Sequence, residues 1–531
     1  MSKKSFIRGA AILAGAGILI KIIGAVYRIA LGNILTTEAS SYYAIVYPWY
    51  NGLLVFASAA VPAAIARLVS EKHAQEDYHG GQKVLKIAFR MLVAFGVFGA
   101  VFMLIGAEVI PEKLGNPGAA YAFKALAVAV FFVSMMAAFR GYFQGLQELR
   151  PFAISQITEQ LGRVIFGFVF VFVMLKSGDE LSAAGATFGA SAGAAVGFFT
   201  ILLIYLRHKK YNPIEKLNDF PVESGMAIIK KIMIIAIPIT LGSSVVPLLN
   251  MIDSFIVINR LTGIGFGDKA NDMYGYIAFF SVSIINLPQV LITAVQISLL
   301  PAVSELMTKN DTEKLRKTIN TGIKVSSIIG IPAAIGISFL SKEILSLLYP
   351  TQPEVIANAS SVLGILGIGV IFLAVFQSTT GALQGMGKQF LPARNLFIGA
   401  IAKVFVCYIL VGIPSVNING AAISTLLAYF IAMVLNMASL SKHLNIGKSI
   451  LDIIGKPLIS GLIMGVLAKG TVLLLGGIIG VKVATVLAIA VGGMSYLLLL
   501  FVTQTFTDDD FEFIPGKKII KKLYRKLGFQ K

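Results

Sequence analysis

Charged residues inside long apolar runs are the features of this 531-residue sequence that best suit chemistry. Five of them are basic and two are acidic: Lys21, Arg28, Arg163, Arg260 and Lys403, together with Glu159 and Asp253. A charge at the centre of a bilayer costs about 3 kcal/mol or more, so such a side chain faces a bundle interior or a hydrated cavity. Because the cations outnumber the anions, the set favours a binding site for an anionic group.

The acidic members of this set allow two interpretations each. Glu159 and Arg163 are four residues apart, the helical spacing at which a carboxylate and a guanidinium meet. Arg163 binds the substrate and Glu159 acts as a coupling or charge-pair residue, or the two simply neutralise each other. Asp253 is a structural partner of Lys403 or a protonation site, and the sequence leaves both open.

The remaining basic residues also allow a structural interpretation beside a role in ligand binding. Lys21 and Arg28 are seven residues apart and therefore share one helix face. Lys21 snorkels to the interface if its helix starts later than its apolar run. Arg28 lies deeper in the same run, and we expect it to contact a ligand. Arg260 belongs to a substrate site or to an outer connector.

Composition excludes a soluble protein. Residues of the set AVILMFWYC make up 56% of the chain, charged residues make up 13%, and the mean hydropathy is +0.83. A soluble domain averages about 45–50% apolar and about 25% charged residues. The net charge of +19 lies largely in connectors, so we expect no nucleic-acid partner. The single cysteine, Cys407, excludes an internal disulfide, and without a metal-ligand motif we expect no metal and no cofactor.

The elements that position these charges are predicted to be fourteen membrane-spanning helices. The apolar runs cover 8–33, 42–66, 87–107, 121–144, 152–175, 183–206, 232–258, 274–303, 322–341, 355–383, 391–412, 419–440, 453–475 and 480–503. Of the 45 Lys and Arg residues, 33 fall in the amino terminus, the connectors on one side and the tail. Because basic residues concentrate in cytoplasmic connectors, this bias predicts a multi-pass protein of the bacterial cytoplasmic membrane with both termini inside.

Internal similarity predicts that the fold is an all-α body of two six-helix lobes in parallel repeat, plus two extra C-terminal helices. FRGYFQGLQELRP at 139–151 resembles TTGALQGMGKQFLP at 379–392, an offset of about 240, and 58–72 resembles 297–309 at an offset of 239. Arg163 and Lys403 are then equivalent residues facing a shared cavity.

This repeat divides the chain into five predicted parts. They are an N-lobe (1–210), a cytoplasmic connector (211–231), a C-lobe (232–445), helices 13 and 14 (446–506) and a basic amphipathic tail (507–531). Four glycines at a spacing of four, Gly185, Gly189, Gly193 and Gly197, predict close helix packing. The tail predicts an interfacial helix on anionic membrane lipids.

The stretch FRGYFQGLQELRPFAISQITEQLGRVIFG at 139–167 resembles the stage V sporulation protein B group. KIIGAVYR (21–28), VPAAIARLVSE (61–71) and NMIDSFIVINRL (250–261) resemble it too. That group is related to the MurJ-type lipid II flippases within the multidrug/oligosaccharidyl-lipid/polysaccharide exporter superfamily. The resemblance covers the whole chain.

The resemblance implies that an undecaprenyl-pyrophosphate-linked sugar precursor is flipped from the inner to the outer leaflet, for peptidoglycan or spore cortex synthesis. It implies pyrophosphate contacts for Lys21 and Arg28, and corresponding roles for the charged residues of helices 5 and 7, Glu159, Arg163, Asp253 and Arg260. It also implies a lipid-tail groove in helices 13 and 14.

We therefore expect a monomeric transporter with an anionic lipid-linked saccharide as cargo and a proton or sodium ion as coupling ion. One alternative is a cation-coupled multidrug exporter of the same superfamily, which should carry more acid than base within its spans. The other is a membrane enzyme acting on lipid-linked sugars. The sequence feature that favours it is an acidic run that could bind a metal ion, Asp508, Asp509 and Asp510.

Overall fold

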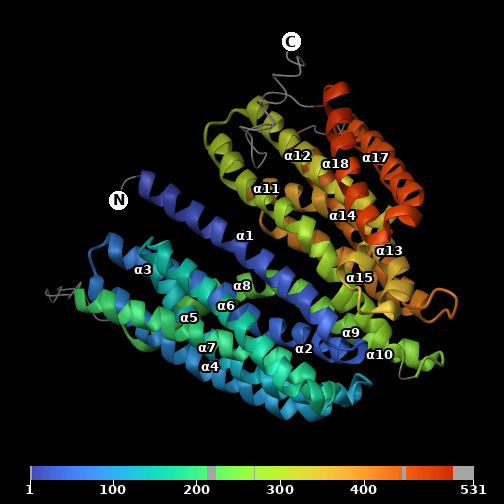
Figure 1. The fold of residues 1–531 in the computed structure, drawn as a ribbon. Helices are drawn as coiled ribbons and strands as arrows, with labels where there is room; N and C mark the ends of the chain where they lie inside the picture. Colours follow the sequence, from blue (N-terminus) through green and yellow to red (C-terminus); the bar gives the residue numbers. More distant parts are fainter. Residues whose placement is uncertain (1–2, 212–222, 268, 445–449, 506–531) are drawn as a thin grey trace. The chain divides into compact units, whose positions relative to one another are not determined.

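A computed structural model describes residues 3–211, 223–267, 269–444 and 450–505, and every regular element in these ranges is a helix. The tail from 506 onwards, with Asp508, Asp509 and Asp510, lies outside the described residues, as does most of the predicted connector. Contacts between Cα atoms divide the chain into two compact units, Met1–Asn259 and Arg260–Lys531 (Figure 1). The predicted all-α membrane fold is confirmed.

The first unit contains the helices that precede Arg260. Its elements are α1 (Lys3–Ile34), α2 (Thr37–Val55), the π-helical segment η1 (Phe56–Ala60), α3 (Val61–Ala74), α4 (Tyr78–Lys113), the short 3-10 turn η2 (Pro117–Ala119), α5 (Ala120–Gly145), α6 (Leu149–Met174), the 3-10 turn η3 (Leu175–Ser177), α7 (Asp179–Tyr211), α8 (Gly225–Ser243) and α9 (Val245–Gly263), which ends just inside the second unit. Within this unit α6 packs along α7, and α5 packs between α4 and α7.

The described part of the second unit is also built from helices. Its elements are α10 (Lys269–Gly275), the π-helical segment η4 (Tyr276–Ser281), α11 (Val282–Thr308), α12 (Thr312–Phe339), α13 (Ser341–Leu348), α14 (Pro353–Gly385), α15 (Phe390–Val411), α16 (Asn419–Leu444), α17 (Ile450–Ile479) and α18 (Val481–Val502). Helices α15 and α16 pack together, as do α12 and α14.

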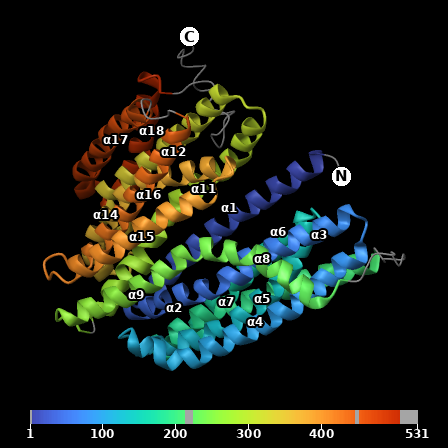
Figure 2. The same cartoon turned by 180° about the vertical axis from the view of Figure 1, so that it is seen from behind.

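The predicted span at 232–258 is two helices, α8 and α9, joined at Ser244 (Figure 2). The described residues therefore contain fifteen helices long and apolar enough to cross a membrane, where the sequence analysis predicted fourteen. Pro247 explains the break, because a proline ring clashes with the carbonyl four residues earlier, here that of Ser243. Each half has 19 residues.

The internal duplication is visible in matching details of the two units. Asp77 and Asp311 each cap a helix by accepting a backbone N–H three residues on, and the residues before them, Glu76 and Asn310, both have positive φ. Asp311 lies 234 positions after Asp77 (311 minus 77).

This offset corrects the predicted alignment of the second and eighth spans, 42–66 and 274–303. A Cβ at Gly145 would meet Val69, and a Cβ at Gly385 would meet Val303, which again places α3 and α11 234 residues apart (303 minus 69). The sequence match at 239 is therefore shifted by five residues. It aligned Pro62 with Pro301, and a shared proline does not mark the same height on both helices.

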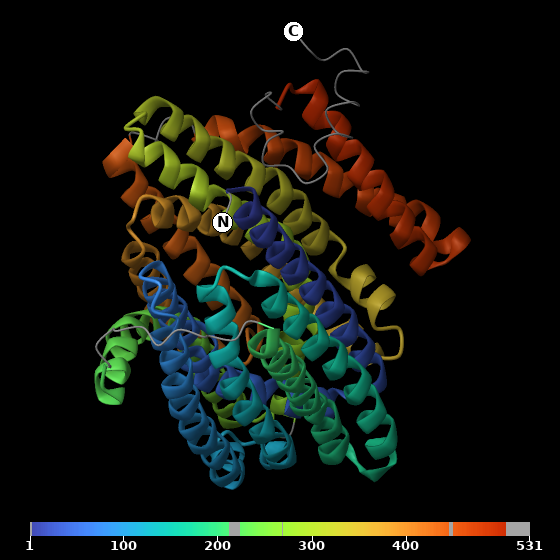
Figure 3. The ribbon, with the colours of Figure 1, turned by 90° about the vertical axis from the view of Figure 1, so that its left-hand side faces the viewer.

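Helices α17 and α18 form a hairpin that packs on α12 and α13 of the same unit (Figure 3, red). An ion pair between Lys469 on α17 and Glu343 on α13, 2.6 Å long, adds a polar anchor to this contact. The two extra helices are thus fastened to the second repeat by apolar packing and by one charge pair. Their predicted role as a lipid-tail groove stays a prediction.

The start of α8 is tied to the α3–α4 loop by a cluster of charges outside the spans. Glu223 accepts from Lys231 at 2.8 Å and pairs with Lys72 at 3.3 Å, while Lys72 also pairs with Asp77 at 2.9 Å. Hydrogen bonds from Lys231 hold the pKa of Glu223 below its usual range despite partial burial. Burial raises the pKa of Asp77, but the Lys72 ammonium and the Gly80 N–H outweigh it and lower that pKa.

The contact units group α8 and α9 with the first six spans, whereas the repeat assigns them to the C-lobe. Helix α8 packs on α3, α4 and η1, which accounts for this grouping. The predicted lobe boundaries are those of the sequence repeat and differ from the boundary between the two units. They stay a prediction.

Candidate functional site

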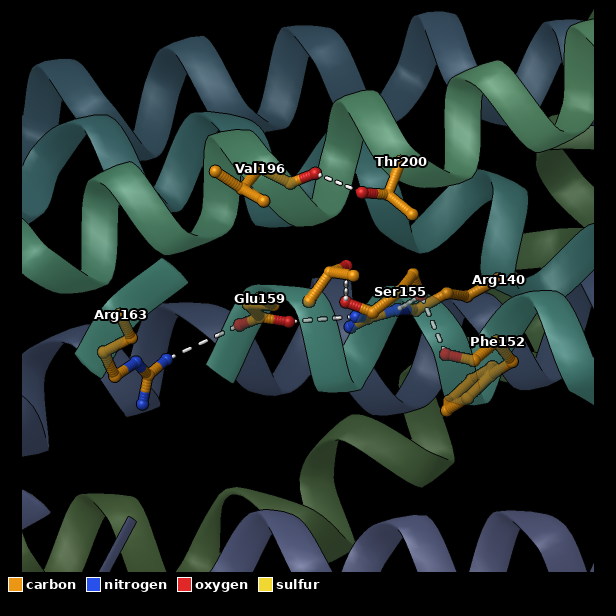
Figure 4. A network of polar contacts seen from close by, with 8 residues as sticks. Arg140, Phe152, Ser155, Glu159, Arg163, Val196 and Thr200 are labelled. Atoms are coloured by element: carbon orange, nitrogen blue, oxygen red, sulfur yellow. Dashed lines mark hydrogen bonds and ion pairs between the residues drawn. The ribbon is translucent and has the colours of Figure 1, made fainter. Parts of the chain in front are cut away.

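Two guanidinium groups meet at one carboxylate in the first unit. Arg140, near the end of α5, donates through Nη2 to Oε2 of Glu159 at 2.9 Å and through Nε to Oγ of Ser155 at 3.0 Å. Arg163 reaches the other carboxylate oxygen from one turn along α6, at 3.5 Å (Figure 4). The side chains of Arg140, Glu159 and Arg163 are 12%, 15% and 22% exposed, so the cluster carries one net positive charge in a largely dehydrated setting.

Arg163 is the less satisfied of the two arginines. Its contact with Glu159 is long and single, whereas Arg140 makes a short contact and a second bond to Ser155. The Nε of Arg163 is buried and has no hydrogen-bond partner among the residues that the structure describes. A guanidinium with unused, buried donors is suited to receive an anion.

Glycines of α7 hold α6 in place beneath this cluster. A Cβ at Gly193 would lie 2.5 Å from the carbonyl oxygen of Glu159, and one at Gly189 would lie 2.4 Å from Cα of Gly167. The two backbones approach so closely because these residues lack side chains. The predicted glycine stripe thus positions the carboxylate and the adjacent turn of α6.

Tyrosines of α1 and α2 line the neighbourhood of Arg163. Tyr43, Tyr47 and Tyr50 recur at helical spacing on α2, with a hydrogen bond of 2.9 Å from the Tyr43 hydroxyl to that of Tyr47. All three interact electrostatically with Arg163, and Tyr43 also interacts with Arg28 on α1. The structure therefore brings Arg28 and Arg163, which are far apart in the sequence, near one shared tyrosine, Tyr43.

The other predicted residues of the first unit differ in exposure. Lys21 is exposed on α1, and Asp253 is half-buried on α9. Met251, two residues before Asp253, lies against α2, where its sulfur would be 3.0 Å from a Cβ at Gly52. A role for Lys21 or Asp253 in binding or coupling stays a prediction.

In the second unit, Arg260 stacks over the ring of Tyr408, 4.2 Å from its centroid, and donates through Nε to the carbonyl oxygen of the same residue at 3.2 Å. A Cβ at Gly412 would collide with this guanidinium. These contacts hold Arg260 of α9 against the C-terminal end of α15, and its role in substrate binding stays a prediction.

Lys403 is buried on α15, 7% exposed. The contact between Gly399 and Ala428 repeats the contact between Glu159 and Gly193, so residues 159 and 399 are equivalent. Lys403 then occupies the position of Arg163, as the sequence predicts. The position of Glu159 is held by a glycine, which supplies no carboxylate.

The second unit replaces the ionic cluster with neutral amides and hydroxyls. Asn395, at the position of Ser155, donates to Asn436 at 2.9 Å, and Asn436 donates to Thr380, at the position of Arg140, at 3.1 Å. Hydrogen bonds can therefore join the three helices of this repeat without charge. The ions of the first unit are not needed for packing alone, which supports a further role for them.

Sequence reasoning missed Arg140 and the tyrosines of α2. Arg140 lies four residues before the end of its predicted span, 121–144, and was left out of the charged residues assigned to span interiors. The signal that marks it is Glu159, whose charge requires partners in a buried setting. For the tyrosines, the spacing of Tyr43, Tyr47 and Tyr50 on one helix face was available.

Within the described ranges, no group of three or more His, Cys, Asp or Glu residues is arranged to hold a metal ion. Cys407 is a buried free thiol.

Comparisons with known proteins agree with the helical membrane fold. The polysaccharide biosynthesis protein family model matches residues 6–307, more than half of the chain, and the MatE model matches 238–409. The lipid II flippase MurJ of Bacillus subtilis (strain 168) is 27% identical over 94% of this chain and 95% of its own length. Stage V sporulation protein B of the same organism is 25% identical over 98% and 100%.

Solved structures share the fold. Lipid II flippase MurJ in an inward closed conformation superposes with a TM-score of 0.70 at 16% identity, covering 92% of this chain and 98% of that one. A multidrug resistance MATE family transporter of the MOP superfamily, in an inward-facing conformation, gives 0.67 at 14% identity, covering 81% and 98%. The resemblance inferred from the motifs is thereby confirmed. The chain is a multi-pass membrane protein, and it belongs to the polysaccharide biosynthesis protein family.

Proposed function

We propose that this protein flips an anionic, undecaprenyl-pyrophosphate-linked saccharide from the inner to the outer leaflet of the bacterial cytoplasmic membrane, by alternating access and as a monomer with both termini inside. The observation that carries the proposal is the excess positive charge of the Arg140–Glu159–Arg163 cluster, with the buried Nε of Arg163 unpartnered within the described ranges. The relative named lipid II flippase supports a cargo of this class.

The residues act in distinct ways. Arg28 and Arg163, which share the tyrosine neighbourhood, bind the phosphates, and Lys21 attracts them on entry. Arg140 fixes Glu159 and keeps its carboxylate in place when Arg163 turns to the ligand. Lys403 supplies the equivalent cation of the second repeat, and Arg260 holds the end of α9 on α15.

Electrical driving force follows from the sign of the cargo. Outward movement of one negative charge gains about 2.3 kcal/mol per 100 mV of inside-negative potential. A proton or sodium ion taken up at Asp253 or Glu159 resets the empty carrier. If a reconstituted protein moves the lipid at a rate independent of an imposed voltage, the electrical contribution is refuted.

The test is leaflet exposure of a fluorescent, pyrophosphate-linked polyprenyl saccharide in proteoliposomes. Arg28→Ala and Arg163→Gln should each lower the initial rate at least about tenfold, the equivalent of 1.4 kcal/mol. The matched control is Arg67→Gln, because Arg67 is 67% exposed and pairs with Glu71. Equal rates for Arg163→Gln and Arg67→Gln would refute the assignment of the cluster.

A second candidate is a cation-coupled multidrug exporter, favoured by the MatE match at 238–409 and by the shared MATE fold. Such a protein binds organic cations and should be limited by intramembrane acids. Efflux of a cationic dye that depends on Asp253, without movement of the lipid-linked saccharide, would favour this candidate over the flippase.

A further inference from the structure

An apolar groove lies between α1 and the first turns of α6, on the stretch of α6 that also carries Ser155 and leads to Glu159. Its volume is about 360 Å³. Gly15, Ala16 and Leu19 line it from α1, and Ala153, Ile154 and Ile157 line it from α6. Among the described residues that line the groove, Arg150 is the charged one.

The groove exists because the two helices make close contact only further along. A Cβ at Gly24 would lie 3.2 Å from the side chain of Gln160, and a Cβ at Gly167 would collide with the hydroxyl of Tyr27. At Gly15, in contrast, a Cβ would meet nothing within 4 Å. The start of α1 therefore leaves space beside α6 that no side chain of the described residues fills.

The lining suits a hydrocarbon chain. Leu19 is 46% and Ile154 is 47% exposed, so apolar surface remains uncovered in this unit. In a membrane protein such a surface meets lipid, and each buried methylene contributes about 0.8 kcal/mol. A helix with its side chains is about 10–12 Å wide, so even one turn of about 5.4 Å occupies more than the groove's volume of about 360 Å³. The space fits one chain better than a helix.

Arg150 supplies the headgroup contact. It is exposed and is the second residue of α6, whose first turn contains no acidic residue. Among the described residues, no carboxylate forms an ion pair with it. Its neighbour Glu148 lies 3.7 Å from His208. The positive end of the helix dipole adds to the guanidinium charge, so the mouth of the groove attracts an anion.

We propose that this groove binds an anionic phospholipid of the surrounding bilayer, with one acyl chain between α1 and α6 and its phosphate on Arg150. The proposed occupant is a lipid of the bilayer and not the cargo of the proposed function. A bound lipid would fill the space beside the start of α1 and stabilise its packing on α6.

The test is native mass spectrometry of the full-length protein with phosphatidylglycerol or phosphatidylcholine of identical chains. The parent should retain phosphatidylglycerol preferentially. Arg150→Gln should lower that preference about fivefold, which corresponds to the ~1 kcal/mol contributed by one basic residue near anionic lipid. Arg207→Gln is the control, because Arg207 is an exposed arginine that does not line the groove.

A second variant tests the acyl-chain contact independently. Gly15→Leu should fill the groove and lower retention of both phospholipids, whereas Gly17→Leu should not, since Gly17 also meets nothing within 4 Å but lies outside the lining. Identical behaviour of Arg150→Gln and Arg207→Gln, or of Gly15→Leu and Gly17→Leu, would overturn the proposal. So would displacement of phosphatidylglycerol by a polyprenyl phosphate, because the occupant would then be the cargo tail.

Discussion

Replacing Glu159 by glutamine should destabilise the first unit strongly, because Glu159 is the carboxylate that holds both arginines of the cluster. With an effective dielectric constant of 20, unit charges 2.9 Å apart attract by about 6 kcal/mol and charges 3.5 Å apart by about 5 kcal/mol, before desolvation is subtracted. Removing one partner of a buried pair typically costs about 3–5 kcal/mol, since the remaining charge stays buried. We expect a loss in this range for Glu159→Gln.

The double-mutant cycle separates the charge pair from general packing damage. Arg140→Gln alone should cost less than Glu159→Gln, because Glu159 keeps Arg163. The combined variant should lose about 2 kcal/mol less than the sum of the two single losses, within the usual range for coupled neighbours. The assay is equilibrium unfolding in mixed micelles, followed by circular dichroism.

The matched control is the exposed pair of Arg67 and Glu71, which are 67% and 51% exposed. Its coupling should not exceed about 0.5 kcal/mol, as is usual for helical surface pairs. Were the coupling between Arg140 and Glu159 as small as that of the control pair, the view of the cluster as a buried ionic site would be wrong.

Three further outcomes follow from the geometry. Gly189→Ala should lower the unfolding free energy by about 1–3 kcal/mol through its backbone clash, whereas Gly17→Ala should not, as thermal unfolding in detergent will show. The lowered pKa values of Asp77 and Glu223 stabilise the α3–α4 loop at neutral pH. This stabilisation should be lost as the pH falls below the ordinary values of 3.8 and 4.5 towards the lower pKa values of the folded protein, seen as faster backbone hydrogen exchange there. Arg260→Lys should lower thermal stability, because an ammonium cannot reproduce both the stack and the hydrogen bond on α15.

The helices and the duplication could be predicted from apolar runs and repeated motifs, because hydrophobic length and glycine spacing are local properties of the chain. The break at Ser244 was not predicted, since Pro247 can kink a helix or end it, and only the surrounding packing decides between the two. The register of α3 against α11 was misjudged because the match relied on Pro62 and Pro301 and not on the helix caps.

The site was predictable in part. The spacing of Glu159 and Arg163 indicated their contact, and the structure confirms it at 3.5 Å. The third member, Arg140, comes from another helix, and no spacing rule connects residues 19 positions apart on two helices. The stacking of Arg260 on Tyr408 likewise depends on tertiary packing, which the sequence did not reveal.

Leaflet exposure of a pyrophosphate-linked polyprenyl saccharide in proteoliposomes tests the central claim most directly, with Arg163→Gln compared with the parent at equal amounts of folded protein. We expect rapid exposure by the parent and a rate reduced at least about tenfold by the variant. Exposure at the same rate by both, or no exposure by the parent beyond that of protein-free liposomes, would contradict it.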